Sequence, residues 1–159
     1  MRSKSKCLEK YIMQNKESHY RVAYSYVKNK EDALDIVQDS IYKAFKSISV
    51  LENTDNINSW FYRILINTAI DYIRKNSKIS LVEDFILDSN DDSKEDNYED
   101  IDLQKALDNL PEINKTVITL RYFEDLRLED IADILGENLS TVKTRLYTGL
   151  RKLRIEMEE

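Results

Sequence analysis

The sequence predicts an all-α protein, with two small helical domains joined by a flexible acidic linker. Glycine (2 residues) and proline (1) are scarce in a chain of 159 residues, whereas proteins built of strands and turns need many of both. Charged residues make up 34% and hydrophobic residues 42%, a balance typical of amphipathic helices. Residues 79–102 hold one basic and ten acidic side chains in a chain of net charge −6. Such a segment repels itself and buries little, which predicts a linker.

Several classes of protein are disfavoured by residue types that are rare or absent. The single cysteine, Cys7, permits no intramolecular disulfide, which fits a reducing cytoplasm. The basic N-terminus has no apolar run after it, so we expect no signal peptide, and no apolar run is long enough to span a membrane. We find no metal-ligand cluster, glycine-rich phosphate loop or nucleophile constellation, and expect no cofactor, metal or catalysis. The one histidine, His19, is expected to have a surface or core role.

Residues 31–48 have the strongest helical periodicity of the N-terminal part. One apolar stripe is expected to face the core, together with Tyr20, Ala23, Tyr24 and Val27 from an earlier helix over residues 16–28; the stripe comprises Leu34, Val37, Ile41, Ala44, Phe45 and Ile48. A second stripe beside it comprises Asp35, Gln38, Asp39 and Tyr42. This second stripe is either a solvated face or a docking face for a basic partner.

Residues 59–76 predict another helix, with Ser59 as its N-cap. Its expected core side chains are Phe61, Ile64, Leu65, Thr68, Tyr72 and Ile73, and its opposite side carries Arg63, Asn67, Asp71 and Arg74. Asparagine is a poor residue for a helix interior. Asn67 therefore either makes a local side-chain bond or reads the edge of a base. The polar residues 49–59 predict a loop before this helix.

The C-terminal part predicts a helix-turn-helix. A helix over Leu128–Leu135 ends at Gly136, and Ser140 is expected to cap a second helix. Val142, Leu146, Leu150 and Leu153 form the predicted buried stripe of this second helix. The other side suits a DNA major groove, with base-contacting residues in the middle and cations at the flanks; it comprises Thr141, Thr144, Tyr147, Thr148 and Arg151, flanked by Lys143 and Arg145.

These three segments, in this order, resemble the extracytoplasmic-function (group IV) sigma factors of bacterial RNA polymerase, within the sigma-70 family. "DALDIVQDSIYKAF" resembles the polymerase-binding helix, "SWFYRILINTAIDYIRK" the −10 promoter helix, and "LEDIADILGENLSTVKTRLYTGLRKLR" the −35 helix-turn-helix. The residues of these three segments are most similar to those of the sigma-V-like, cell-envelope-stress members of the family. The resemblance implies a region 2-like domain at 1–78, the linker at 79–102 and a region 4-like domain at 103–159.

The resemblance also implies partners and roles for particular residues. The expected partners are promoter DNA, the polymerase core through its β′ clamp helices and β flap, and a membrane-anchored anti-sigma factor. The protein would be cytoplasmic, held at the inner face of the membrane by that factor, with no small-molecule substrate. The residues expected to bind the polymerase are Asp35, Gln38, Asp39 and Tyr42. Those expected to bind the −10 element are Arg63, Asn67, Asp71 and Arg74. Those expected to bind the −35 element are Ser140, Thr141, Lys143, Thr144, Arg145, Tyr147, Thr148 and Arg151.

The second helix of the helix-turn-helix departs from the usual family sequence at two positions. Family members usually carry a basic residue and then alanine where this chain has Thr148 and Gly149. Because glycine within a helix costs about 1 kcal/mol relative to alanine, the second helix is expected to be less rigid here.

Two alternative functions lack the features that they would need. A free-standing operator-binding dimer would need a dimerisation helix, which the sequence does not show. An enzyme would need one of the missing catalytic motifs.

Overall fold

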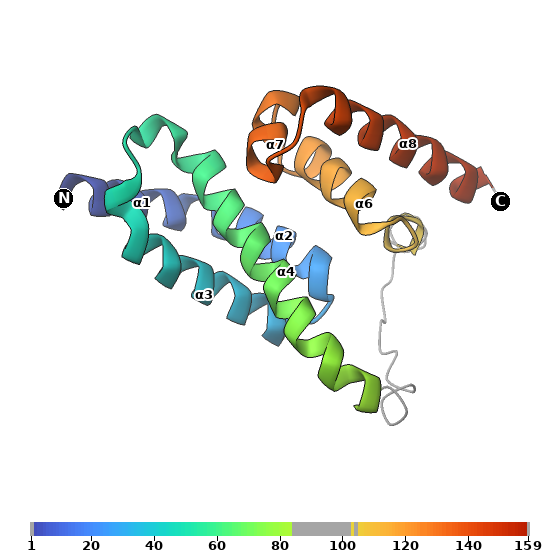
Figure 1. Cartoon of the computed structure of the whole chain (residues 1–159), viewed down its shortest axis with the longest axis horizontal. Coiled ribbons are helices and arrows are strands. Elements are labelled where there is room, and N and C mark those ends of the chain that lie inside the picture. Colours follow the sequence, from blue (N-terminus) through green and yellow to red (C-terminus); the bar gives the residue numbers. More distant parts are fainter. Residues whose placement is uncertain (1, 84–102, 104, 159) are drawn as a thin grey trace. The chain divides into compact units, whose positions relative to one another are not determined.

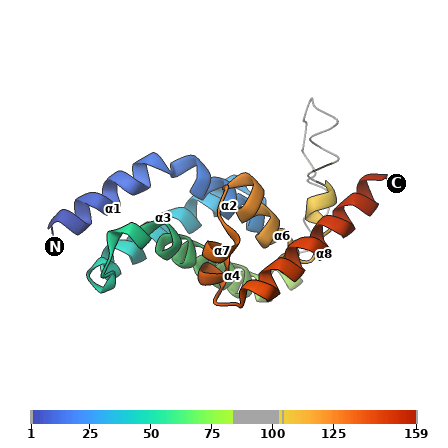
Figure 2. The ribbon, with the colours of Figure 1, turned by 90° about the horizontal axis from the view of Figure 1, so that it is seen from above.

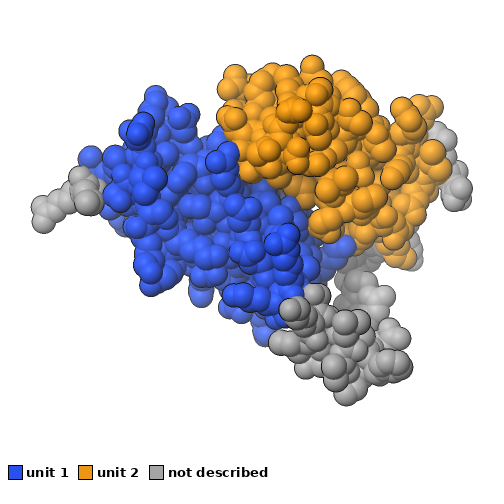
Figure 3. Space-filling model, viewed as in Figure 1, with its two compact units in different colours: residues 1–85 blue, residues 86–159 orange. Residues whose placement is uncertain are grey.

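A computed structural model describes residues 2–83, 103 and 105–158 of the chain. The described residues form helices and turns, with no strand among them (Figure 1). The chain divides into two compact units, residues 1–85 and 86–159 (Figure 3). The prediction of an all-α fold is therefore confirmed.

Unit 1 contains helices α1 (Arg2–Gln14), α2 (Lys16–Val27), α3 (Lys30–Ser47) and α4 (Ile57–Glu83). Helices α2, α3 and α4 pack against one another, while α1 contacts both α3 and α4 (Figures 1 and 2). Lys28 ends α2 in a left-handed conformation, and the Asn29 side chain then accepts a hydrogen bond from the Asp32 amide at 3.0 Å. This cap starts α3 at once, so two long helices follow with almost no loop between them.

The predicted core stripe of α3 is confirmed at Ala44 and Ile48 and wrong at Leu34 and Phe45. The buried side chains are Ala33, Ile36, Ser40, Ala44 and Ile48, whereas Leu34 and Phe45 are 43% and 41% exposed. Small residues on the inner face let α3 lie close to its neighbours, and the Ser40 hydroxyl is satisfied by donating to the Ile36 carbonyl at 2.7 Å. In α2, likewise, His19, Val22 and Ala23 are buried, while Tyr24 is 40% exposed.

The start of α4 also differs from expectation. Short 3₁₀ turns at Ile48–Val50 and Thr54–Asn56 lead into the helix, and the Asn53 side chain caps the second turn. Ser59 therefore lies inside α4 rather than at its N-cap, and the predicted loop at 49–59 is mostly helical. The helix continues to Glu83, which makes the first part of the predicted linker at 79–102 helical. The rest of that segment lies outside the described residues.

Unit 2 contains α6 (Glu112–Ile118), a π-helical turn (Thr119–Phe123), α7 (Leu128–Leu135) and α8 (Leu139–Glu158), preceded by a short helical segment around residues 105–108. Its core holds Leu107, Val117, Leu120, Ile131 and Val142, and α8 packs on both α6 and α7. Gly136 ends α7 with a φ of 66°, as the sequence predicts. Because α8 begins at Leu139, Ser140 lies in its first turn and is not the cap.

Gly149 has a packing explanation that the sequence did not reveal. It is buried where α8 meets α6, and a Cβ there would lie 2.9 Å from Ile118 Cδ1 and 3.1 Å from Asn114 Cβ. The Asn114 side chain also donates to the Arg145 carbonyl at 2.8 Å. Glycine thus permits a close approach of α6 to α8, which accounts for a residue that was expected only to loosen the helix.

Candidate nucleic-acid and partner interfaces

The outer face of α4 brings together the four residues expected at the −10 element. Arg63, Asn67, Asp71 and Arg74 are all exposed, and the intervening Ile66 and Thr68 are buried in the core of unit 1. Asn67 thus presents its amide at the surface, where it offers both a donor and an acceptor. Trp60 is half-buried, and Tyr62 is buried in the core of unit 1.

The outer face of α3 carries Asp35, Gln38, Asp39 and Tyr42, which we call the docking face. All four are exposed, Tyr42 to 62%. The Asp39 carboxylate forms an ion pair with Lys43 at 3.5 Å, and Lys46 Nζ lies 5.2 Å from the Tyr42 ring. The net character of the docking face remains acidic and aromatic, which suits a basic partner surface.

An apolar groove adjoins the docking face and was missed by the sequence reasoning. It has a volume of about 760 Å³ and lies between α1, α2 and α3; it is lined mainly by Ile12, Met13, Tyr20, Tyr24, Leu34, Val37 and Ile41, with Gln38 at its edge. Leu34, Val37 and Ile41 of this groove belong to the stripe that was expected in the core. The signal was present in the sequence, because α3 has more apolar positions than one buried face can use.

Helix α8 presents the residues expected at the −35 element. Ser140, Lys143, Thr144, Tyr147 and Arg151 are exposed, while Thr141, Arg145 and Thr148 are half-buried. The stripe on its other side is buried at Val142 and Leu146 and half-buried at Leu150 and Leu153. Arg145 is not simply a free flanking cation, because its Nη2 pairs with the Glu137 carboxylate at 3.2 Å.

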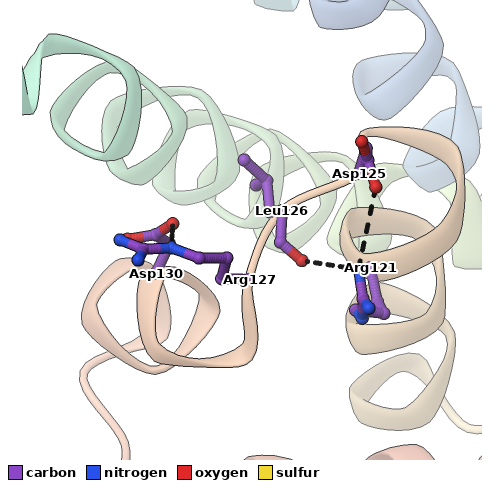
Figure 4. A network of polar contacts seen from close by, with 5 residues as sticks. All are labelled: Arg121, Asp125, Leu126, Arg127 and Asp130. Atoms are coloured by element: carbon purple, nitrogen blue, oxygen red, sulfur yellow. Dashed lines mark hydrogen bonds and ion pairs between the residues drawn. The ribbon is translucent and has the colours of Figure 1, made fainter.

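Two arginines stabilise the loop that leads into the helix-turn-helix (Figure 4). Arg121 Nη1 donates to the Leu126 carbonyl at 3.3 Å and lies 3.7 Å from the Asp125 carboxylate. Arg127 Nε donates to Asp130 at 3.2 Å, across the first turn of α7. Asp125 itself has a left-handed backbone with φ of 54°. These contacts hold the turn that sets where α7 begins.

Comparison with known proteins identifies the family. Residues 11–79 match the Sigma-70 region 2 family, and residues 100–153 match the Sigma-70 region 4 family. The RNA polymerase sigma factor SigV of Bacillus subtilis is 53% identical over 92% of this chain and 88% of its own length. This chain belongs to the sigma-70 family, as an extracytoplasmic-function sigma factor.

Two further sigma factors extend the comparison. The ECF RNA polymerase sigma factor SigE of Mycolicibacterium smegmatis is 31% identical over 92% of this chain, which spans 60% of that relative's length. The solved structure of the sigma factor RpoE in complex with the anti-sigma factor NepR, from Bartonella quintana, aligns over 94% of this chain and 96% of its own with a TM-score of 0.79 at 22% identity. At that identity the likeness concerns the fold alone.

His19 is a core residue of this sigma factor. It is 1% exposed, its ring stacks on Phe61 at 4.4 Å, and the Tyr11 hydroxyl lies 3.0 Å from its Nε2. That hydroxyl donates its hydrogen to Asn58 Oδ1 at 2.6 Å. The Nε2 atom of His19 is therefore protonated and donates a hydrogen bond to the Tyr11 oxygen. Burial lowers the pKa of His19 to about 4, so the ring is neutral. The expected surface or core role is confirmed as a core role.

Two structural findings concern metals and membranes. Within the described part of this sigma factor, no group of three or more histidine, cysteine, aspartate or glutamate side chains could hold a metal ion. No helix among the described residues is long and apolar enough to cross a membrane.

Proposed function

We propose that this sigma factor binds RNA polymerase core through the docking face and the adjoining apolar groove, and directs it to promoters that α4 and α8 read. The observation that carries the proposal is that most residues of all three polar faces are exposed, on helices whose opposite sides form the cores of two separate units. A side chain at the surface is accessible to another molecule, and each face has the chemistry that its partner requires.

Each face is assigned to one step. The docking face and groove bind the β′ clamp helices, with Asp35, Gln38 and Asp39 supplying polar contacts and the groove supplying apolar area. Asn67 reads one base of the displaced −10 strand, and Arg63 and Arg74 hold its phosphates. The exposed face of α8 enters the major groove of the −35 element, and unit 2 also contacts the β flap. The protein supplies recognition and no catalytic chemistry of its own.

The domain boundaries and the regulation form part of the same proposal. Residues 1–78 form the polymerase- and −10-binding domain, residues 103–159 the −35-binding domain, and residues 79–102 the linker. One solved structure of similar fold is the sigma factor RpoE in complex with the anti-sigma factor NepR. An anti-sigma factor, anchored in the membrane, holds this protein in the cytoplasm at the inner face of the membrane until cell-envelope stress releases it.

The polymerase arm of the proposal is tested by co-purification with core enzyme. Asp39→Arg replaces an exposed carboxylate by a cation beside Lys43, and should weaken polymerase binding about tenfold or more, because like charges would meet at the interface. Lys30→Met, at the exposed start of the same helix, serves as the control and should bind normally. Normal binding by Asp39→Arg, with an unchanged melting curve, would remove the docking face from the proposal.

The promoter arm is tested by transcription from a library with randomised −35 and −10 elements, which also yields the preferred promoter. Asn67→Ala should bind polymerase normally, fail to open DNA in permanganate footprinting, and lose its base preference at one −10 position. Gln14→Ala removes an exposed amide from α1 and should keep the wild-type preference. If Asn67→Ala opens DNA with unchanged preferences, base reading does not belong to this amide.

A further inference from the structure

A polar cleft lies between α3 and α4, and it connects the docking face to the face that carries Asn67. Its volume is about 200 Å³. One wall includes Asp35 and Asp39 of the docking face, and the other includes Asp71 of the −10 face. Lys43 lies within this cleft, and its ammonium group contacts a residue of α3 and a residue of α4 at the same time.

Lys43 makes one contact to each side. Its Nζ donates to Thr68 Oγ1 at 3.1 Å and lies 3.5 Å from Asp39 Oδ2. The Thr68 hydroxyl uses its own hydrogen on the Ile64 carbonyl at 2.7 Å, which leaves its oxygen free to accept from the ammonium group. The resulting chain runs from an exposed carboxylate on α3 to a buried hydroxyl on α4, and then to the backbone of α4.

The backbone that this chain reaches is the turn that presents Asn67. Thr68 is 3% exposed and directly follows Asn67, which is exposed. A threonine hydroxyl bonded to the carbonyl four residues earlier tends to bend a helix, so the geometry of this turn depends on what else the hydroxyl contacts. A charge-assisted bond from Lys43 is the strongest contact available to it.

The packing of α3 on α4 does not depend on Lys43. The Tyr72 hydroxyl, one turn after Thr68 on α4, donates to Asp32 Oδ1 of α3 at 2.6 Å, and Ile36 and Leu65 are fully buried. The Lys43 side chain is itself 43% exposed, so its ammonium could remain hydrated instead. Its ordered contact with a buried hydroxyl therefore points to a role in positioning rather than in folding.

We propose that Lys43 is a positioning residue that couples polymerase docking on α3 to base reading on α4. This inference rests on the function proposed above. When a basic polymerase surface engages Asp39, that carboxylate leaves Lys43, and the ammonium group bonds more strongly to Thr68 and fixes the turn of Asn67. Because coupling between two sites is reciprocal, binding of the −10 strand raises the affinity for polymerase to the same extent.

The test measures that reciprocity in the full-length protein. Polymerase affinity is determined with and without a single-stranded oligonucleotide that carries the −10 non-template sequence of the selected promoter. Lys43→Met keeps the stem and removes the charge, Thr68→Val keeps the volume and removes the hydroxyl, and the double variant removes both. Lys30→Met is the control with the same loss of charge on the same helix. Fluorescence of Trp60, in α4, follows the unfolding of unit 1.

In the wild type and in Lys30→Met, the oligonucleotide should raise polymerase affinity by about fivefold or more. Each of Lys43→Met and Thr68→Val should abolish most of this gain while the unfolding curve stays unchanged. Polymerase affinity without DNA should stay unchanged in Thr68→Val and should not fall in Lys43→Met, because that change releases Asp39 from its ion pair. The double variant should equal either single variant, because both break one contact.

Three results would overturn the inference: a full gain in Lys43→Met, additive losses in the double variant, or a parallel fall in stability and polymerase affinity. A wild type that binds polymerase but gains nothing from the oligonucleotide also contradicts it. Failure of the wild type to bind polymerase at all is a separate outcome, which refutes the proposed function itself.

Discussion

Acidification should destabilise unit 1 through His19. The ring is 1% exposed, and burial lowers its pKa from 6.5 to about 4. Its Nδ1 has no hydrogen-bond partner within the described residues, so a proton added there would be buried and unpaired. Since the folded-state pKa lies below the unfolded value, the unfolded chain binds the proton more tightly. Stability is therefore complete above pH 6.5 and falls as the pH decreases toward 4.

The magnitude follows from the two pKa values. At pH 5 an unfolded histidine of pKa 6.5 is almost fully protonated, whereas His19 with its pKa of about 4 is mostly neutral in the folded protein. The free energy of unfolding should thus be about 2 kcal/mol lower at pH 5 than at pH 7. The chain has a single histidine, so no other imidazole contributes to this window. Most carboxylates titrate below it.

Urea unfolding followed by Trp60 fluorescence provides the measurement at pH 5, 6 and 7, because the chain's one tryptophan lies in unit 1. The His19→Phe variant is the control, since an aromatic ring can keep the stacking on Phe61 while Tyr11 still donates to Asn58. Its absolute stability is unimportant, but it should lose the decrease of about 2 kcal/mol between pH 7 and pH 5 that His19 contributes. Equal wild-type stability at pH 5 and pH 7, or an unchanged slope in His19→Phe, would refute the reasoning.

The remaining predictions concern unit 2. Gly149→Val should destabilise it by about 1–3 kcal/mol in urea unfolding followed by circular dichroism, because the added carbons would overlap α6; an unchanged midpoint would mean that the helices separate at little cost. Glu137→Gln should tighten binding to duplex DNA and steepen its salt dependence by releasing Arg145 to a phosphate, and no change in slope would contradict this. Arg151→Ala should cost about 1–3 kcal/mol on the preferred −35 sequence and relax specificity, whereas Lys143→Ala should weaken all sequences alike; identical profiles on scrambled DNA would contradict the assignment of the α8 face.

The sequence alone predicted helices α2, α3 and α4, the helix-turn-helix and which polar residues share a face, but not helix α1 or the helical turns within residues 49–59. Gly136 specifies the end of α7 because the residue after the helix adopts a left-handed backbone, which glycine does without strain. This requirement is local, so the sequence reveals it. Asn67, Arg63 and Arg74 are exposed together because a spacing of three or four residues fixes a common side of any helix. Whether these residues touch DNA remains a prediction that the structure does not test.

Only the tertiary structure decided which apolar stripe of α3 is buried and why Gly149 is present. Hydrophobicity favours Leu34, Val37 and Ile41 as core residues, but the buried side of α3 carries Ala33, Ile36 and Ser40 instead. That choice depends on the volumes of side chains distant in the sequence, which periodicity within one helix does not contain. Gly149 likewise contacts α6, more than thirty residues earlier in the chain. A side chain at this position is excluded only because α6 packs against α8, which the sequence of α8 does not reveal.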